Sequence, residues 1–348
     1  MVGIDVSERS IKIVELAGGM APKLRTVCWS SLAPNLMRRG VIQDAVVMGE
    51  TIEAALIKCT PMPVSSRTAV VSIPETQSFV RVLELPKMSI REMDEAVQWA
   101  IRHHIPFDLD RVYLDWQPLI NTSGNANRQQ VLVGAAQRDV IDPLLGALDM
   151  IGLRVVALEL EAQAIVRSLL PLDAADVSGV LLVDLGATAT DIIFFDRGAM
   201  RFTGSIQRGG DDLTQNLAQE LKIQPAIAAE KKASVGLRAT EKDPQVAATL
   251  RKATLELVEQ VHKVAQELIA QLNLPDGIKT VLLSGGAANL PGLVDVFSEI
   301  FPSVPVQLGN SLINLVVGRE SKAATISPAD AMHFTTAIGL ALRQEEVH

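Results

Sequence analysis

The chain has 348 residues, of which 48% are hydrophobic, and its formal net charge at pH 7 is −8. This length allows two domains, or one large nested domain, with a substantial core. Aromatic residues make up only 3% of the chain, which argues against the stacking platforms that bind single-stranded nucleic acid. The acidic balance also disfavours a general nucleic-acid-binding surface.

The two cysteines, Cys28 and Cys59, lie far apart in the sequence. Their number and spacing predict neither a disulfide framework nor a cysteine-ligated zinc or iron–sulfur site, so a reducing cytoplasm is the expected location. Asp5, Glu8 and Arg9 interrupt any hydrophobic segment near the N-terminus. No stretch approaches the roughly 20 apolar residues of a membrane span. We therefore expect a soluble protein, which could still sit at a membrane through a partner.

The first half of the chain predicts strands at 2–6, 11–16 and 25–32, followed by a helix over 43–59 that Pro61 and Pro63 end. The stretch 68–150 then predicts a compact module. It has strands at 68–73 and 79–85, and a helix that extends to 104 after a capping box of Ser89 and Glu92. Strands at 111–119 and 129–136 and a helix over 140–150 complete this module.

The second half predicts a strand at 155–159, a helix over 162–170 and a boundary at 171–178. An apolar run at 180–183 precedes Asp184, and the turn Asp196-Arg197-Gly198 between two apolar runs predicts a hairpin. We expect helices over 212–221, 225–235 and 244–272, a strand at 280–284, a helix from 290, and one closing helix over 328–342.

Both halves open with the same pattern, in which an aspartate follows an apolar strand and a polar turn leads into a second strand. Asp5 ends the first such strand and Asp184 ends the second. Small residues in these turns let backbone amides approach an anion. An aspartate in this place can hold Mg²⁺, usually through water. Two facing turns of this kind predict a nucleotide clamp, whereas the alternative is a pair of ordinary polar turns.

This repeated pattern, followed by a strand, Gly285-Gly286 and a helix, resembles the actin, Hsp70 and hexokinase superfamily. Closer matches resemble the PilM family of type IV pilus assembly proteins. They lie at 3–16, 105–110, 184–188, 209–214, 285–293 and 337–343, in the family's order and over nearly the whole chain.

The resemblance implies an α/β fold of the actin-like (ribonuclease H-like) class, similar to FtsA, with two lobes around a nucleotide. The first lobe would span 1–170, with its core at 1–67 and 151–170, the closing helix at 328–345, and a small α+β insert at about 68–150. The second lobe would span 171–327, with a helical subdomain at about 212–272.

The resemblance also implies ATP and Mg²⁺ as cofactors, with Asp5 and Asp184 holding the ion through water. The implied nucleotide-binding set is Asp5, Ser7, Ser10, Lys12, Asp184, Gly186, Ala187, Thr188, Gly209, Gly210, Asp211, Glu230, Lys232, Gly285, Gly286 and Asn289.

Several of these residues have plainer alternatives. Lys12, Glu230 and Lys232 could lie on solvated faces, Asp211 could cap a helix, and Asn289 could cap the helix after it. No residue stands out as a base for an attacking water. Glu161 and Gln163, near the link between the lobes, are candidates by position only, so we expect at most a slow ATPase.

One departure from the family pattern concerns Glu8 and Arg9, which stand where the family usually has small hydroxyl residues. A carboxylate beside a triphosphate is unfavourable unless it points away or pairs with a cation such as Arg9. This departure bears on nucleotide affinity rather than on the fold.

The function implied is that of an assembly protein of a type IV pilus or related secretion machinery. It would dock the N-terminal cytoplasmic tail of a PilN-like inner-membrane protein in a groove between the insert and the first-lobe core, with the nucleotide as a conformational switch. One alternative is a small-molecule kinase, with Asp191 or Asp115 as the base. Another is an FtsA-like filament protein, but such proteins usually end in a basic amphipathic helix, which residues 343–348 do not provide.

Overall fold

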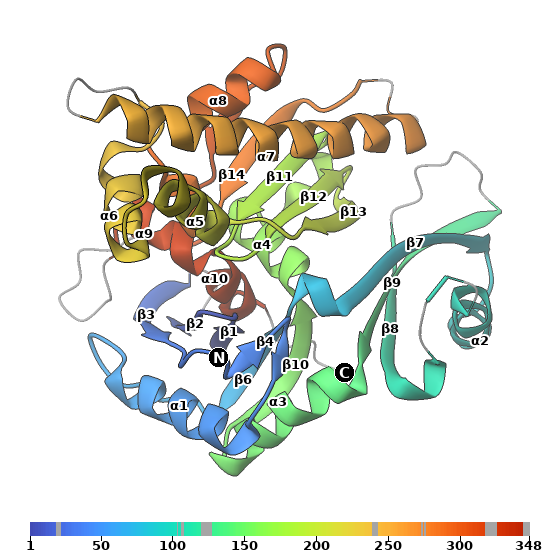
Figure 1. The fold of residues 1–348 in the computed structure, drawn as a ribbon. Helices are drawn as coiled ribbons and strands as arrows, with labels where there is room; N and C mark the ends of the chain where they lie inside the picture. Colours follow the sequence, from blue (N-terminus) through green and yellow to red (C-terminus); the bar gives the residue numbers. More distant parts are fainter. Residues whose placement is uncertain are drawn as a thin grey trace.

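The computed structural model describes residues 1–18, 22–102, 104–105, 108–119, 127–238, 243–272, 274, 276–316 and 326–343. Their strands form two five-stranded sheets, a three-stranded sheet and a two-stranded sheet. Figure 1 shows one five-stranded sheet in the lower half of the molecule, the other in the upper half beneath α7 (Pro244–Gln271), and the three-stranded sheet to the right. We call the two five-stranded sheets with their helices the first and second lobes.

The first lobe contains β1 (Val2–Val6), β2 (Ser10–Ala17), β3 (Lys23–Ser31), β6 (Thr68–Ile73) and β10 (Arg154–Leu160), in the order β10-β6-β1-β2-β3. β1 pairs antiparallel with β2 and parallel with β6. Helices α1 (Ala45–Lys58) and α3 (Arg138–Met150) pack on one face, where Ile4, Ile13, Met48 and Leu148 share a core. β1 therefore lies in the middle of its sheet and is fully buried.

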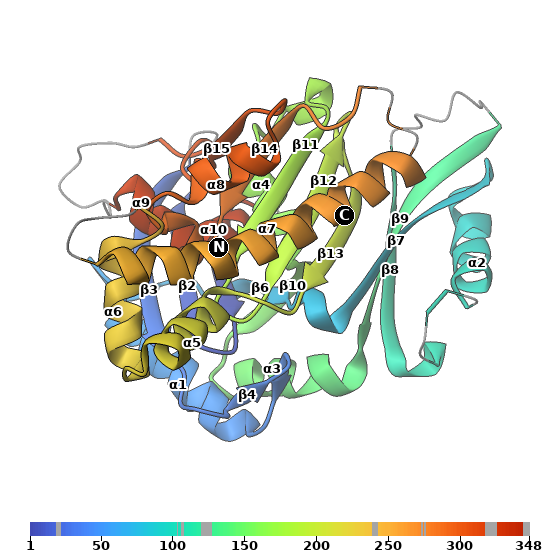
Figure 2. The same ribbon diagram turned by 45° about the horizontal axis from the view of Figure 1, so that its top comes forward.

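The second lobe contains β11 (Val180–Leu185), β12 (Thr190–Asp196), β13 (Ala199–Ile206), β14 (Thr280–Ser284) and β15 (Val306–Leu308), in the order β13-β12-β11-β14-β15. Helices α5 (Gly210–Leu221), α6 (Pro225–Val235), α7 and α8 (Leu293–Ile300) share one core with this sheet. Figure 2 shows α7 running across it. The predicted hairpin is confirmed, and Arg197 and Gly198 both have positive φ (48° and 74°), which suits a tight two-residue turn.

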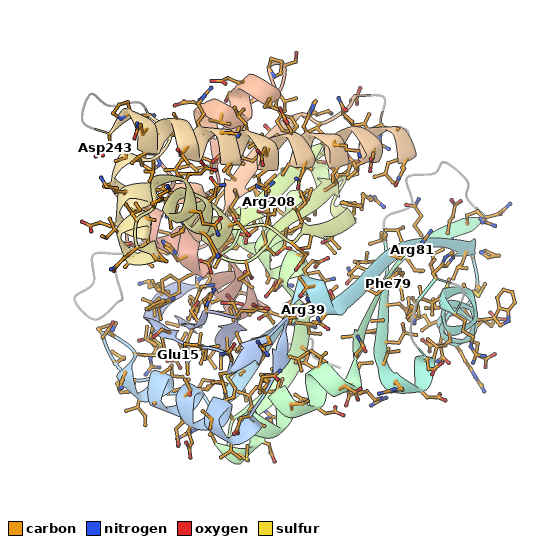
Figure 3. All side chains as sticks on the ribbon, in the orientation of Figure 1. Glu15, Arg39, Phe79, Arg81, Arg208 and Asp243 are labelled. Carbon is orange, nitrogen blue, oxygen red and sulfur yellow. A yellow bond between two sulfur atoms is a disulfide. The ribbon has the colours of Figure 1, made fainter. Side chains whose placement is uncertain are left out.

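The third sheet consists of β7 (Ser78–Pro86), β8 (Val112–Pro118) and β9 (Arg128–Gln137), with α2 (Ile90–Ile101) packed on it. The capping box of Ser89 and Glu92 is confirmed. In Figure 3, Phe79 and Arg81 mark the part of β7 that leads away from the first lobe. The predicted module at 68–150 was too wide, because β6 pairs within the first lobe and α3 packs against α1. We propose 78–137 as the insert.

Helix α10 (Thr335–Ala341) lies between β1 and α4 (Glu161–Leu169). The two helices approach closely at Gly339, where an added Cβ would overlap the carbonyl oxygen of Ala164. At Gly3 an added Cβ would likewise overlap the carbonyl oxygen of Ala337. Glycine therefore permits the close contact that joins the end of the chain to its beginning. No described helix is long and apolar enough to cross a membrane.

Three predictions of local structure were wrong. The closing helix is broken into α9 (Pro328–Ala331), a 3₁₀ turn at Met332–Phe334 and α10, because Phe334 leaves helical geometry to pack in the core. The sequence did not predict the two short strands β4 (Met37–Arg38) and β5 (Val41–Ile42), which pair with each other, or strand β15. The cysteines are not separate: Cys28 and Cys59 form a disulfide, because Val27 pairs with Thr60 and brings β3 beside the end of α1.

Candidate functional site

A cavity of about 680 Å³ is lined by residues of both lobes. It lies at the ends of β1 and β11, where the two aspartate-containing turns begin. The predicted residues that line it are Asp5, Ser7, Ser10, Lys12, Glu161, Asp184, Gly186, Ala187, Thr188, Gly210, Asp211, Lys232, Gly285, Gly286 and Asn289. Gly209, Glu230 and Gln163 are not among the lining residues. The fold therefore brings the two turns, which are distant in sequence, to one cavity.

The first turn is anchored by a buried ion pair. Lys12 lies opposite Asp5 in the β1–β2 hairpin, and its Nζ donates to Asp5 Oδ2 at 2.9 Å. Ser72 on the neighbouring strand β6 donates to the other carboxylate oxygen at 3.1 Å. Ser7 and Ser10 close the turn, since the Ser7 hydroxyl and amide both donate to the Ser10 carbonyl. The plainer alternative, a solvated Lys12, is not what the geometry shows.

The environment of Lys12 keeps its charge in place. Burial lowers the pKa of Lys12, but the charges of Asp5, Asp184 and Glu161 outweigh that effect and raise it. Lys12 therefore stays positively charged. It lines the cavity and interacts electrostatically with carboxylates of both lobes.

The second turn is built on Asp184 at the end of β11. Ser284, at the corresponding end of the parallel neighbour β14, donates a hydrogen bond to Asp184 Oδ1. Burial raises the pKa of Asp184, and the hydrogen bond from Ser284 and the charge of Lys12 offset part of that rise. The Gly186 amide donates to the Ala189 carbonyl at 2.9 Å, which closes the turn. The two turns thus have the same plan, an aspartate held by a hydroxyl from the adjacent strand.

The Gly209–Asp211 segment packs against this second turn. The amides of Gly210 and Asp211 donate to the carbonyls of Gly186 and Ala187 at 2.9 and 2.8 Å. A Cβ at Gly209 would lie 2.5 Å from the Ala187 carbonyl oxygen. These first amides of α5 therefore hold the turn in place. Because they already donate to its carbonyls, they do not bind an anion directly, contrary to the sequence-based prediction. Nor does Asp211 cap the helix: the side chain of Asp212 does so, accepting from the Gly209 amide at 2.8 Å.

An ion pair crosses from one lobe to the other at the cavity. Arg9, in the turn after β1, lies with its Nε 2.8 Å from Oδ2 of Asp211 in the first turn of α5. Both residues line the cavity. The structure pairs Arg9 with this carboxylate of the second lobe, whereas the sequence left open a pairing with its neighbour Glu8.

Three further carboxyl groups line the cavity: Glu75, Glu161 and Asp191. Glu75 is 8% exposed and Asp191 is 9% exposed. Thr203 of β13 donates to Glu75 Oε1 at 2.6 Å, whereas Glu75 Oε2 and Asp191 Oδ1 have no hydrogen-bond partner among the described residues. Burial raises the pKa of Glu75 to about 7, although the Thr203 hydrogen bond opposes the rise.

The pKa values of Glu161 and Asp191 are raised well above their usual range, again by burial first. The charges of Asp5 and Asp191 add to the effect at Glu161, and those of Glu75 and Asp184 add to it at Asp191. A carboxyl group with a raised pKa carries less negative charge at a given pH than an ordinary one. A polyanionic ligand is therefore less strongly repelled than the number of acidic residues suggests.

The other side of the cavity is formed by the turn at Gly285 and Gly286. Gly285 has φ 84°, and a Cβ there would lie 2.5 Å from the carbonyl oxygen of Leu185. A Cβ at Gly286 would lie 2.6 Å from Nδ1 of His333, so the imidazole lies against this turn. Burial and the charge of Lys12 lower the pKa of His333, which favours a neutral ring. A neutral imidazole beside bare backbone makes a surface suited to a flat, uncharged ring.

Asn289 and Lys232 support this side of the cavity. Asn289 lies in a 3₁₀ turn, Gly286–Asn289, and its amide donates to the Ala329 carbonyl at 2.8 Å. The plainer alternative, that Asn289 caps the next helix, is not realised, because Gly292 holds the N-cap position of α8. Lys232 Nζ donates to the Gly210 carbonyl at 2.6 Å, while Glu230 is exposed.

The cavity residues that sequence reasoning missed include Trp29, Arg39, Glu75 and His333. Trp29 lies opposite Lys12 in the β2–β3 pairing, so the two share a face of the sheet. Arg39, labelled in Figure 3, comes from the β4–β5 hairpin. The sequence offered one signal for these residues: Trp29 lies in a strand predicted to follow the strand of Lys12.

The acidic side chains of the cavity determine how Mg²⁺ could be bound there. Among the described residues, no three His, Cys, Asp or Glu side chains converge in a way that could hold a metal ion. Mg²⁺ in nucleotide sites usually keeps several waters and is bound by one or two carboxylates together with phosphates. Asp5 and Asp184, one from each turn, fit that mode and do not fit an all-protein metal cage.

Comparison with known proteins places the chain in a family. A family model described as type IV pilus assembly protein PilM matches residues 3–345. The chain belongs to the PilM family of type IV pilus assembly proteins. This PilM-family chain is also similar to a solved structure titled "PilM-PilN type IV pilus biogenesis complex", with a TM-score of 0.83 and 23% identity over 98% of this chain and 97% of that one.

Two further relatives confirm the predicted actin-like, FtsA-like fold class. A structure of MreB5 of Spiroplasma citri bound to ADP matches with a TM-score of 0.51 and 12% identity, over 96% of this chain and 94% of that one. FtsA of Pseudomonas aeruginosa is 34% identical over 178 residues, which cover 45% of this chain and 42% of that protein. The match thus spans less than half of that FtsA.

Proposed function

We propose that this PilM-family chain binds Mg-ATP between its two lobes and that the bound nucleotide controls docking of the cytoplasmic N-terminal tail of a PilN-like inner-membrane protein. The observation that carries the proposal is the pair of aspartate-containing turns, one from each lobe, that line one cavity of about 680 Å³. A cavity of this size suits a ligand as large as a nucleotide.

The residues present fit this ligand. Asp5 and Asp184 would hold Mg²⁺ through water, and the ion would neutralise part of the phosphate charge. The turns at 7–10 and 186–188 would bind the phosphates, with Lys12 as a fixed positive charge between the lobes. Gly285, Gly286 and the neighbouring His333 would contact the sugar or the base, with Lys232 behind them.

The switch follows from the division of the site between two lobes. A ligand that contacts both turns at once favours the arrangement in which they face each other, and it shifts the equilibrium by its difference in affinity for the two arrangements. ATP binding is thereby coupled to any surface that changes with lobe position. Hydrolysis would be slow and would serve to reset the switch.

The partner would bind in a groove between the insert at 78–137 and the first-lobe core. A solved structure with which the chain shares its fold is titled as a PilM–PilN complex, which supports a PilN-like protein as the partner. The chain would then be cytoplasmic and would reach the inner membrane through this partner and other pilus or secretion assembly components.

The test is to titrate a fluorescent peptide of the partner's cytoplasmic tail into the protein, without nucleotide and with Mg-ATP, and to follow anisotropy. The proposal predicts a peptide affinity that changes with Mg-ATP in the wild type and does not change in Asp184→Asn. Asp173→Asn, an exposed carboxylate outside the cavity, is the matched control and should behave as the wild type. The same peptide affinity with and without nucleotide in the wild type would refute the switch.

A further inference from the structure

The contact between Arg9 and Asp211 joins the two lobes beside the phosphate turns. Arg9 belongs to the β1–β2 turn and Asp211 to the first turn of α5, 202 residues away in sequence. Their side chains are 61% and 44% exposed, and their Nε–Oδ2 distance is 2.8 Å. Since both residues line the cavity, a ligand there can reach the guanidinium directly.

Asp211 occupies a place that favours an anion. It lies at the N-terminal end of α5, where the helix dipole stabilises negative charge, and Lys232 is close enough for its pKa to be affected by the Asp211 charge. The Asp211 carboxylate accepts from Nε of Arg9, and a phosphate oxygen can accept from the same donor, because a guanidinium binds both carboxylates and phosphates.

Lys12 and Lys232, two other cations that line the cavity, each have a close partner of their own. Lys12 is in a largely buried pair with Asp5, with side chains 20% and 4% exposed, and Lys232 Nζ donates to the Gly210 carbonyl. Arg9 is in an exposed pair, and such pairs contribute little to stability and are weakened further by salt. Of these three cations, Arg9 is therefore the one that can change partner at least cost.

We propose that Arg9 leaves Asp211 and binds the terminal phosphate of ATP, so that it distinguishes ATP from ADP. This inference rests on the proposed nucleotide site and names the residue that reads the nucleotide's state. With ADP bound, or with no nucleotide, Arg9 stays on Asp211 and links the lobes directly. With ATP bound, the link between the lobes passes through the phosphate, and Asp211 is left free.

The exchange gives the switch a defined chemical event. The bond to Asp211 uses the Nε donor of Arg9, so a phosphate oxygen that takes this donor displaces the carboxylate. A charge-assisted bond to a phosphate is stronger than an exposed ion pair. The exchange is thus favourable with ATP and does not occur with ADP, which lacks the γ-phosphate.

The experiment measures Mg-ATP and Mg-ADP affinity by calorimetry for the wild type, Arg9→Gln and Arg9→Lys. Arg238→Gln is the matched control, because Arg238 forms an exposed pair with Asp295 outside the cavity. We expect Arg9→Gln to lose affinity for ATP by roughly tenfold or more while its ADP affinity changes little. Arg9→Lys should lose less, since it keeps the charge but not the fork, and Arg238→Gln should match the wild type.

Asp211→Asn gives an independent check, because removing the competing carboxylate should raise ATP affinity while Arg9 remains. Thermal denaturation should give similar midpoints for all four variants, since the altered pairs are exposed. Equal ATP-to-ADP affinity ratios in the wild type and Arg9→Gln would overturn this inference alone. A wild type that binds neither nucleotide would overturn the proposed site as well as the inference.

Discussion

Lys12 Nζ lies 2.9 Å from Asp5 Oδ2, and the two residues face each other across the β1–β2 hairpin. The pair is mostly buried, and Asp5 has Ser72 as its second partner. An ion pair in this position fixes the first turn and places one positive charge among the carboxyl groups of both lobes.

Removing the lysine alone should therefore be costly. We expect Lys12→Met to lower the free energy of unfolding by about 3 kcal/mol, because it leaves a buried carboxylate without its cation. The double variant Asp5→Asn/Lys12→Met should recover a large part of that loss, since neither charge remains. Denaturant unfolding of the two variants checks this. Equal losses in both would contradict a coupled pair.

Glu75 should make stability fall as pH rises. The pKa of Glu75 in the fold is about 7, compared with an ordinary value of 4.5. Between these values the folded state binds more protons than the unfolded state, so the free energy of unfolding decreases with increasing pH. Above about pH 7 the full penalty, roughly 3 kcal/mol, is present.

Glu75→Gln removes this penalty and can still accept the hydrogen bond from Thr203. We expect it to be more stable than the wild type at about pH 8, with the difference nearly gone at about pH 4.5. Glu95→Gln, on the exposed surface of α2, is the control. Unfolding curves at both pH values decide the matter, and a pH-independent difference would show that the carboxyl group is not the cause.

Gly339→Ala should disrupt the contact between α10 and α4. The added Cβ would overlap the Ala164 carbonyl oxygen, which is backbone and cannot rotate away. We expect a loss of about 3 kcal/mol in the free energy of unfolding, at the upper end of the usual cost of overpacking. Gly146→Ala, in α3 with nothing within 4 Å of the added atom, should instead stabilise the protein by about 0.5–1 kcal/mol. Losses of similar size in both variants would contradict the packing argument.

The features that could be predicted from the sequence are those that depend on short, local patterns of residues. Asp5 and Asp184 each follow a fully apolar run, and that pattern is enough to place both at strand ends beside a turn. Gly285 and Gly286 follow a strand in the same way. The Ser89 and Glu92 capping box is likewise a local signal, and the structure forms it as predicted.

The features that could not be predicted depend on contacts between distant segments. Arg9 and Asp211 are separated by 202 residues, and no periodicity connects them. The β4–β5 hairpin has two-residue strands, which are too short to show alternation, yet it brings Arg39 to the cavity. Cys28 and Cys59 meet only because Val27 pairs with Thr60 after α1 has folded back.

The role of Glu75 was hidden for the same reason. Its place after β6 predicts nothing special, and its burial depends on Thr203 of the other lobe lying 2.6 Å away. A carboxyl group becomes notable only when the fold surrounds it with apolar contacts and other acids. The cavity gains its unusual carboxyl groups because two lobes enclose it. For the same reason, the sequence alone does not reveal them.

The central claim is that the two aspartate-containing turns form one Mg-ATP site. Calorimetric titration of Mg-ATP into the wild type, Asp184→Asn and the exposed control Asp173→Asn tests it most directly. The account predicts that the wild type and Asp173→Asn bind alike and that Asp184→Asn binds about tenfold more weakly or worse. Absence of binding in the wild type, or undiminished binding in Asp184→Asn, would contradict it.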